Sequence, residues 1–397
     1  MSRIKRRMLI GVVLVALILI GLVLFFYRPT RLALERAEAF QFRRMLVTRL
    51  GAENVYRFFF VTNRNLESGD GPMEERFGNQ REEKLKFGYF DTMIEPTLGI
   101  GMIINPTDWF QNREIQLKQV HPLDRDEFIS QIRQQVKASP LRSILINVNG
   151  FREGFPSALR KTAFLSHVLD IDSPVLVFDW PGDQGSTPQG YRRAQRIASE
   201  SGAELASTLA LVIRQVEPGR LWLVANSMGG QVVVHAFHIL YRDADLADSG
   251  AKIEKVVLTA PDVDKAEFND QFKREIAALS RNLIAYVSSN DRALLLSRIL
   301  NRSRRLGEST LNPQNPDQHE AAAGILELVE PDKDLVTLVD VTPVNRTRNF
   351  HNFSLETPQF FDDLFLRLVN RDMPSSRPEY RIETPTGAVY WVLTRGR

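Results

Sequence analysis

The sequence predicts an α/β protein with a mostly parallel, doubly wound sheet and helices on both faces of that sheet. From residue 141 onward, short apolar runs alternate with longer stretches of helical periodicity. The runs are rich in Val, Ile and Leu and lack polar alternation, which is typical of strands covered on both faces. Regular alternation of strand and helix favours a parallel sheet. The expected strands are 144–148, 175–180, 221–225, 256–260, 283–287 and 335–341.

Helical periodicity fills the intervals between these strands, and a less regular region precedes them. The expected helices of the alternating region are 157–169, 191–216, 228–241, 293–300 and 359–369. Earlier in the chain, the pattern predicts a helix over 30–50, strands over 55–61 and 85–94 with a polar loop over 63–83 between them, and a helix over 124–139 before Pro140. A last strand is expected over 388–393.

Composition excludes several classes of function. The 397 residues carry 51 basic and 48 acidic side chains, and a net charge of +3 is too small to indicate nucleic-acid binding. The absence of cysteine excludes disulfides, thiolate metal sites and a cysteine nucleophile. No phosphate-binding glycine motif follows a strand, and His235 and His238 lack a third ligand at metal spacing. We therefore expect neither a cofactor nor a metal.

The N-terminal region has the pattern of a membrane anchor. Residues 8–27 form a run of 20 uncharged residues, which as a helix spans about 30 Å, the thickness of the hydrocarbon core of a bilayer. A cleaved signal peptide is the alternative, but the run is long for one and ends in Phe25-Phe26-Tyr27 rather than in small residues. We expect an uncleaved single-pass anchor.

Charge around this run bears on its orientation. The basic residues before it favour a cytoplasmic N-terminus, which would place the rest of the chain in the periplasm or outside the cell. A second group of arginines follows the run and opposes this bias. The preceding residues are Arg3, Lys5, Arg6 and Arg7, and the following ones are Arg28, Arg31, Arg36, Arg43 and Arg44.

These patterns suggest five segments. They are a cytoplasmic tail and anchor over 1–28, a juxtamembrane helix over 29–52, an N-terminal extension with strands and one helix over 53–140, an α/β core over 141–375, and a C-terminal tail with a possible strand over 376–397.

Ser227 is the expected nucleophile. It follows the apolar run 221–225 and directly precedes a helix, which is the strand–turn–helix context of a nucleophile elbow. Such a turn needs small flanking residues, and Ala225, Gly229 and Gly230 provide them. The alternative is a serine that only caps the helix, but the preceding buried strand favours the nucleophile.

His351 is the expected general base. A serine hydroxyl is a weak nucleophile unless a base lies beside it. In hydrolases with this alternation of strands and helices, an acid and then a histidine follow the serine along the chain. Of the six histidines, His351 follows the run 335–341 and precedes the last helix, whereas His319 lies in a polar stretch typical of a surface loop.

Two aspartates are candidates for the acid of the triad. Asp291 follows the run 283–287, and Asp262 follows the run 256–260. We expect Asp291, with Asp262 as the alternative, because Asp291 follows the penultimate strand of the series. The acid would hold His351 in the correct tautomer and stabilise its imidazolium form.

Backbone N–H groups of Met228 and Phe151 are the expected donors to the oxyanion. Acyl transfer places negative charge on an oxygen, and donors must be aimed at that oxygen. Met228 directly follows the serine, and Phe151 lies in the loop after the run 144–148, where Gly150 allows a close backbone approach.

Several segments together resemble a bacterial family of α/β hydrolases of unknown function, an esterase- and lipase-like branch of the serine hydrolases. They include Val148-Asn149-Gly150-Phe151, Ala225-Asn226-Ser227-Met228-Gly229, Ala260-Pro261-Asp262-Val263-Asp264 and Phe60-Val61-Thr62-Asn63-Arg64, and the resemblance covers about 55–370. It implies an α/β-hydrolase fold and a serine-type site lined by Asn149, Gly150 and Asn226. The family usually has histidine at positions 149 and 226, and asparagine does not titrate near neutral pH.

The sequence thus predicts a membrane-anchored serine hydrolase that acts on a small-molecule or lipid ester through Ser227, Asp291 and His351. Two alternatives remain open at this stage. One is a catalytically silent hydrolase fold that serves as a binding module, which the two asparagines suggest. The other is an acyltransferase that uses the same triad with an acceptor other than water.

Overall fold

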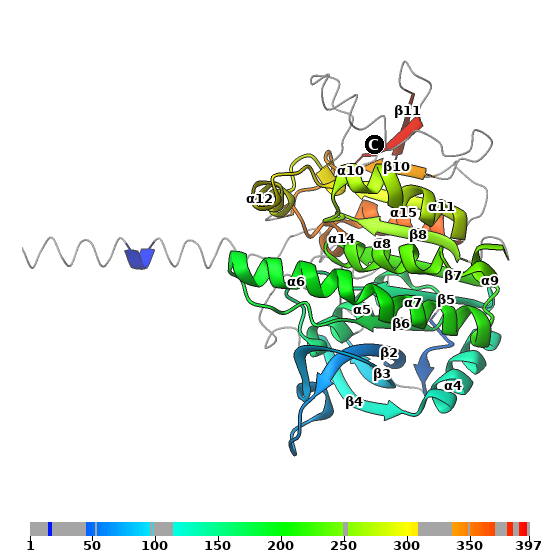
Figure 1. Cartoon of the computed structure of the whole chain (residues 1–397). Helices are drawn as coiled ribbons and strands as arrows, with labels where there is room; N and C mark the ends of the chain where they lie inside the picture. The colour runs from blue at the N-terminus through cyan, green and yellow to red at the C-terminus, as the bar shows by residue number, and fades with distance from the viewer. Residues whose placement is uncertain are drawn as a thin grey trace, which may run out of the picture.

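A single mixed sheet organises the chain in the computed structural model (Figure 1). The structure describes residues 15–17, 45–51, 54–95, 98, 114–248, 253–308, 336–347, 350–369, 379–383 and 389–394. Within them the sheet has the order β11-β12-β10-β9-β8-β7-β5-β6-β2-β3-β4, and β1 pairs with β2 beside this path. The predicted α/β class and mostly parallel sheet are confirmed.

The centre of the sheet is parallel and corresponds to the predicted apolar runs. From β12 through β10, β9, β8, β7, β5 and β6 to β2, every neighbouring pair is parallel. Five of these strands are buried along most of their length, as expected for strands with helices on both sides. They are β5 (Ser143–Val148), β6 (Val175–Asp179), β7 (Arg220–Asn226), β8 (Ile253–Thr259) and β9 (Ser280–Val287), and β10 (Val336–Asp340) follows β9.

The N-terminal edge of the sheet is longer than the sequence predicts. β2 (Val55–Leu66) and β3 (Phe77–Ile94) form an antiparallel hairpin through most of the region that we expected to be a loop over 63–83, so that prediction is wrong. The polar residues that suggested a loop lie on the exposed part of β3, where the backbone still pairs. β4 (Ile115–Leu123) was not predicted, and Pro122 is tolerated there because β4 is the edge strand.

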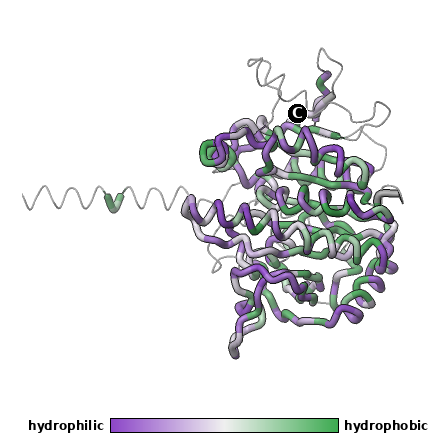
Figure 2. The backbone as a smooth tube through the Cα atoms, in the orientation of Figure 1, coloured by the Kyte–Doolittle hydropathy of each residue, from purple (hydrophilic) through white to green (hydrophobic). Residues whose placement is uncertain are grey.

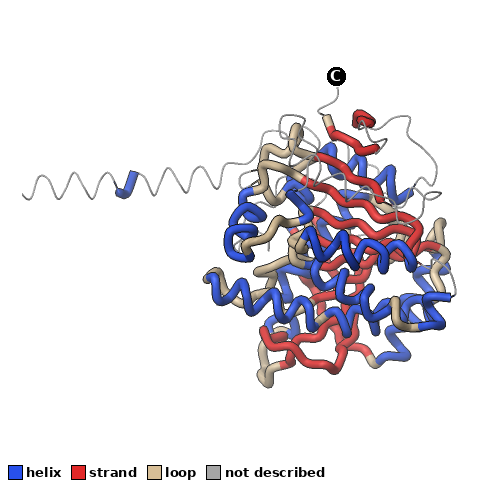
Figure 3. The backbone as a smooth tube through the Cα atoms, turned by 45° about the horizontal axis from the view of Figure 1, so that its top comes forward, coloured by secondary structure: helices blue, strands red, loops and turns tan. Residues whose placement is uncertain are grey.

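Helices cover both faces of the sheet (Figures 1 and 3). One hydrophobic cluster lies beneath α4 (Arg125–Ala138), α6 (Pro188–Glu200), α7 (Gly202–Leu211), α8 (Gly229–Leu240) and α11 (Lys273–Leu279). The opposite cluster lies beneath α5 (Phe155–Leu169), α14 (Phe353–Glu356) and α15 (Pro358–Val369). Short helices α9 (Ala244–Asp248) and α10 (Lys265–Glu267), and α12 (Arg292–Asn301), complete the helices of the core.

The predicted helix over 191–216 is divided in two. α6 begins at Pro188, where the Thr187 side chain accepts a hydrogen bond from the Gly190 N–H, and it ends before Ser201. α7 then begins at Gly202, and a single π-helical turn, Val212–Val216, follows it. A Cβ at Gly202 would lie 2.6 Å from the Cβ of His235, so the glycine allows α7 to pack closely against α8.

At the C-terminal edge, β11 (Glu379–Glu383) and β12 (Val389–Leu393) form an antiparallel pair, and β12 joins β10. The strand expected over 388–393 is therefore confirmed, whereas β11 was not predicted.

The expected membrane span over 8–27 lies outside the described residues except for 15–17, which are helical. Among the residues that the structure describes, no helix combines the length and apolarity needed to cross a membrane. The prediction of a helix over 30–50 is wrong for its last residues, because Arg49–Leu50 form β1, and residues 30–44 lie outside the described part of the chain. The preceding N–H groups of Met45, Leu46 and Val47 donate to the carboxylates of Asp170 and Asp172 instead of to a helical ladder.

Arg64, near the end of β2, joins the N-terminal hairpin to the centre of the sheet. Its guanidinium is fully buried, donates to Asp179 at 2.6 Å and to Asp183 at 2.7 Å, and also bonds three backbone carbonyls. Burial opposes the charged form, but the two carboxylates raise the pKa of Arg64 above its ordinary value. This contact fixes the loop after β6, at the carboxyl end of the sheet.

Candidate active site

Ser227 lies on a sharp turn between β7 and α8. Its φ of 52° falls in the left-handed region, which a residue with a side chain adopts only when its surroundings impose it. Three backbone hydrogen bonds hold this turn. The Ser227 N–H donates to Thr259, and the Ser227 carbonyl accepts from Gly230 at 3.0 Å and from Asp262 at 3.1 Å. The turn has the geometry expected of a nucleophile elbow.

Two glycines allow the loop after β5 to lie directly against this turn. A Cβ at Gly229 would lie 2.6 Å from the carbonyl oxygens of Val148 and Asn149, and one at Gly150 would lie 3.0 Å from the Cβ of Ser227. A side chain at Gly229 would require the backbone to shift, and one at Gly150 would make unusually tight contacts. The absence of these two Cβ atoms lets the loop that carries Phe151 lie directly against the serine turn.

The side chains of Ser227, His351 and Asp291 form one hydrogen-bonded series. His351 Nε2 lies 2.9 Å from Ser227 Oγ, and His351 Nδ1 lies 2.7 Å from Asp291 Oδ2. Asp291 is buried at the start of α12, and its other oxygen accepts from the Leu294 N–H at 2.9 Å, which caps the helix. The structure therefore brings together the three residues that the sequence predicts as nucleophile, base and preferred acid.

The environment of His351 favours its protonated form. Burial opposes the charge, but the carboxylate of Asp291 and its hydrogen bond outweigh burial and raise the pKa of His351 above its ordinary value. The negative charge of Asp262 raises this pKa further, and Lys161 opposes it. A histidine base with an adjacent carboxylate is suited to accept a proton from a serine hydroxyl.

This pKa gives a testable pH dependence. A general base must be neutral, so we expect kcat/KM for an ester to fall as the pH drops through a value above about 6.5, the ordinary pKa of histidine. Asp291→Asn should lower the pKa of His351, since the nearest negative charge is then removed. The measurement is an NMR titration of His351 in both proteins, with the pH profile of the unmodified enzyme. A rate that is flat between about pH 5 and 8 would exclude His351 as the base.

Asp262, the alternative acid, is engaged elsewhere. One carboxylate oxygen accepts from Ser297 at 2.6 Å and from Arg305 at 2.7 Å, and the other accepts from the Tyr191 hydroxyl at 2.7 Å. Burial and the neighbouring carboxylate raise the pKa of Tyr191, so its hydroxyl stays protonated. The geometry therefore favours Asp291 as the partner of His351. Asp262 instead holds Tyr191, Ser297 and Arg305 together.

The Asp262 network was not foreseen from the sequence. Tyr191, Ser297 and Arg305 come from α6, α12 and the segment after α12, and no local motif connects them. The ring of Tyr191 also meets that of Phe151 edge to face, with centroids 5.6 Å apart. The only sequence signal was that Asp262 follows a strand of the same edge as Ser227.

The two expected oxyanion donors lie beside the serine. Met228 is fully buried at the start of α8, and Phe151 follows the glycine that contacts Ser227. Within the described part of the chain, neither backbone N–H donates a hydrogen bond. Both N–H groups therefore lack a hydrogen-bond partner among the described residues, and the start of α8 adds the positive end of a helix dipole, but their role as oxyanion donors stays a prediction.

Asn149 and Asn226, the two expected site-lining asparagines, are structural neighbours of the serine turn. The Asn149 amide donates to the Ala158 carbonyl and to Thr162, so its side chain is directed toward α5. The Asn226 amide donates to Thr259 at 3.0 Å and to Ser354 at 2.9 Å. Asn226 thus connects the serine strand to α14, which directly follows the His351 segment.

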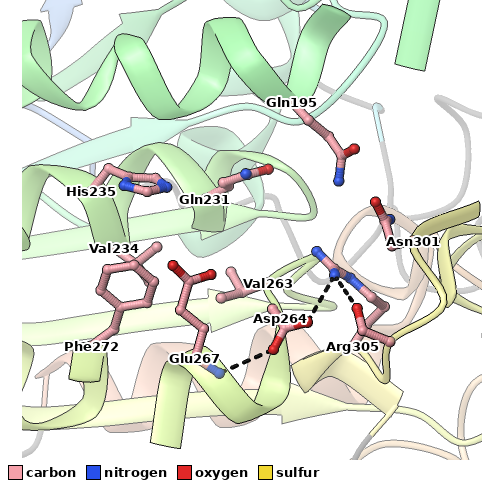
Figure 4. Close-up of a pocket in the computed structure, with 11 residues that line it drawn as sticks. Gln195, Gln231, Val234, His235, Val263, Asp264, Glu267, Phe272, Asn301 and Arg305 are labelled. Atoms are coloured by element: carbon pink, nitrogen blue, oxygen red, sulfur yellow. Dashed lines mark hydrogen bonds and ion pairs between the residues drawn. The ribbon is translucent and has the colours of Figure 1, made fainter. Parts of the chain in front are cut away.

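A separate polar cavity lies between α6, α8 and the segment after β8 (Figure 4). Its volume is about 270 Å³, and Gln195, Gln231, His235, Glu267 and Asn301 are among its lining residues. None of Ser227, His351 or Asp291 lines it.

The remaining histidines lie away from the serine or outside the described residues. His238, on α8, contacts Glu275 at 2.8 Å, and His319 lies outside the described residues. Among the described residues, no group of three His, Asp or Glu side chains could hold a metal.

The sheet with its serine turn defines a protein of the α/β-hydrolase type. The chain belongs to the family described as alpha/beta hydrolase of unknown function (DUF900), whose profile matches residues 124–364, more than half of the chain. The resemblance inferred from the sequence motifs is thereby confirmed.

Comparison with other proteins adds little beyond the family. No curated protein matches the chain. Among solved structures, it is similar to a lipase-esterase related protein from Clostridium acetobutylicum ATCC 824, with 15% sequence identity and a TM-score of 0.21 over 57% of this chain and 89% of that one. A likeness of this degree carries no argument about activity.

Proposed function

We propose that the protein is a membrane-anchored serine hydrolase that cleaves an ester or related acyl bond through an acyl-enzyme. The observation that carries this proposal is the continuous contact from Ser227 Oγ through His351 to Asp291. Hydrogen-bonded nucleophile, base and acid form the arrangement that activates a serine hydroxyl.

In the proposed reaction, Ser227 Oγ attacks the acyl carbonyl while His351 Nε2 accepts the hydroxyl proton. The N–H groups of Met228 and Phe151 stabilise the oxygen that becomes negative. The carbon–oxygen bond to the leaving group then breaks, and His351 gives its proton to the departing alcohol. Water attacks the resulting acyl-serine with His351 again as base, which releases the carboxylic acid and restores the hydroxyl.

Labelling by a fluorophosphonate probe tests the proposal. The probe reacts with serines that an adjacent base has activated, so we expect the full-length protein to be labelled and Ser227→Ala to lose all labelling. Ser354→Ala is a matched control, since Ser354 contacts Asn226 but not His351. Labelling that persists in Ser227→Ala, or no labelling of the folded wild-type protein, would contradict a nucleophilic role for Ser227 and favour a silent binding module.

The anchor is the second part of the proposal, and the run of 20 uncharged residues over 8–27 supports it. We further propose that the N-terminus is cytoplasmic and that the catalytic part faces the periplasm or the cell exterior. Removal of residues 1–28 should move the protein from the membrane fraction to the soluble fraction after alkaline extraction. Recovery of both forms in the soluble fraction would exclude the anchor.

A further inference from the structure

Helix α12 presents three large apolar residues to the outside of the molecule, although its Leu294 is buried. The exposed fractions of Leu295, Leu296 and Ile299 are 41%, 58% and 64%. Figure 2 shows the hydrophobic colouring of this helix at the outer surface of the domain. A helix on the surface of a globular protein normally turns its apolar side toward the core. The outward face of α12 is therefore a candidate surface for a partner.

The orientation of α12 is fixed by polar contacts on its inner side. Ser297 donates to Asp262 and lies 2.7 Å from the Tyr191 hydroxyl, and Asn301 also donates to that hydroxyl. At the start of the helix, Asp291 accepts from the Leu294 N–H. Rotation that buried the apolar face would break these contacts. The outward position of the three apolar residues is thus a property of the folded site.

Arginines surround the apolar face. Arg292 begins the helix and Arg298 lies one turn before its end, and Arg302 and Arg304 follow it. Arg292, Arg302 and Arg304 are exposed, and Arg298 is partly exposed. A helix with large apolar residues on one side and basic residues beside them is suited to the interface of an anionic membrane, where apolar burial and charge attraction add.

The same charges disfavour a second copy of the chain as the partner. In a two-fold symmetric dimer the same patch lies on both sides of the interface, so the arginines of both copies would be brought close together and repel one another. Arg298 already pairs with Glu308 at 3.3 Å, and anionic lipid headgroups would neutralise Arg292, Arg302 and Arg304. Both the charge and the apolar residues of α12 therefore point to a lipid surface.

We propose that the apolar face of α12 lies in the interfacial layer of an anionic bilayer, and that Ser227 acts on acyl lipids of that bilayer. This inference rests on the proposed serine hydrolase function. Asp291 caps the start of α12 and its side chain contacts His351, so the membrane contact adjoins the reacting groups. A lipid ester could then reach the serine without leaving the membrane surface for bulk water.

The first test locates α12 relative to the bilayer. The chain has no cysteine, so Leu296→Cys provides a single position for an environment-sensitive dye in the full-length protein. Ile239→Cys, 42% exposed near the end of α8, is the matched control. In vesicles that contain phosphatidylglycerol, we expect a blue-shifted emission and quenching by acyl-chain nitroxides at position 296 but not at 239, with a smaller effect in pure phosphatidylcholine.

The second test concerns the substrate. We expect Leu296→Asp with Ile299→Asp to lower the ratio of phosphatidylglycerol hydrolysis to soluble p-nitrophenyl ester hydrolysis about tenfold, because membrane contact scales with buried apolar area. Ile239→Asp should leave that ratio unchanged.

The outcomes separate the two proposals. A dye at position 296 that stays in an aqueous environment, while the protein hydrolyses the soluble ester, would overturn the membrane contact and leave the hydrolase standing. A blue shift that depends on protein concentration without lipid would indicate a second copy and also overturn it. Insertion of the dye without any Ser227-dependent hydrolysis would support the membrane contact and overturn the proposed function.

Discussion

Asp291→Asn is expected to lower kcat for ester hydrolysis by about 10⁴-fold, the order of magnitude seen when the acid of a serine triad becomes an amide. The Asp291 carboxylate lies 2.7 Å from His351 Nδ1, so it requires the tautomer whose Nε2 can accept the serine proton. An amide can offer its own N–H to Nδ1 and so favour the wrong tautomer. The substitution also removes the negative charge that stabilises the imidazolium form of His351.

The substitution should leave the fold intact, which makes the rate informative. Asparagine caps helices about as well as aspartate, so the bond from the Leu294 N–H to residue 291 is retained. Asp264→Asn is a matched control, because Asp264 also caps a helix, through the Glu267 N–H, but does not contact His351. The measurement is kcat for a p-nitrophenyl ester with the melting temperature of each protein. Equal rates for the two variants would exclude Asp291 as the acid.

Arg64→Met is expected to lower the free energy of unfolding by about 3–5 kcal/mol, the usual loss when one partner of a buried ion pair is removed. The substitution leaves the fully buried Asp179 without its guanidinium partner, and three carbonyl oxygens lose their donor. Burial already raises the pKa of Asp179, and removal of Arg64 would shift that carboxyl further toward its neutral form.

Urea denaturation of a variant that lacks residues 1–28, the proposed anchor, measures this effect. Arg57→Met is the matched control, because Arg57 pairs with Asp91 at a partly exposed position and should cost about 1 kcal/mol or less. Adding Asp179→Asn to Arg64→Met should recover part of the loss, since no unpaired charge is then buried. If Arg64→Met were no less stable than Arg57→Met, the buried contact would not support the fold.

The parallel centre of the sheet could be predicted because its strands are buried on both sides. In β7 and β8, nearly every residue meets the core, so the sequence is a continuous apolar run. The hairpin of β2 and β3 escaped prediction for the opposite reason. Most of the first half of β3 is exposed, and its polar composition resembles a loop although its backbone is paired. A strand that is paired through its backbone but exposed on both sides has no clear alternation of polar and apolar residues, so the sequence does not predict it.

The candidate site was predicted to the level of residue identity, but not in its supporting contacts. Ser227, His351 and Asp291 each follow a strand at the same edge of the sheet, and that order is visible in the sequence. Asp262 follows a strand in the same way. Only side-chain geometry distinguishes the aspartate that reaches His351 from the one that binds Arg305.

One oxygen of Asp291 caps α12 and the other contacts His351. The ordering of the first turn of α12 is therefore linked to the positioning of the catalytic carboxylate. Any influence that stabilises the first turn of α12 also stabilises the position of the carboxylate beside His351. Thermodynamic coupling of this kind is reciprocal. If a membrane surface stabilises this turn and thereby strengthens the binding of an inhibitor at Ser227 by some factor, the bound inhibitor must strengthen the attachment of α12 to the membrane by the same factor.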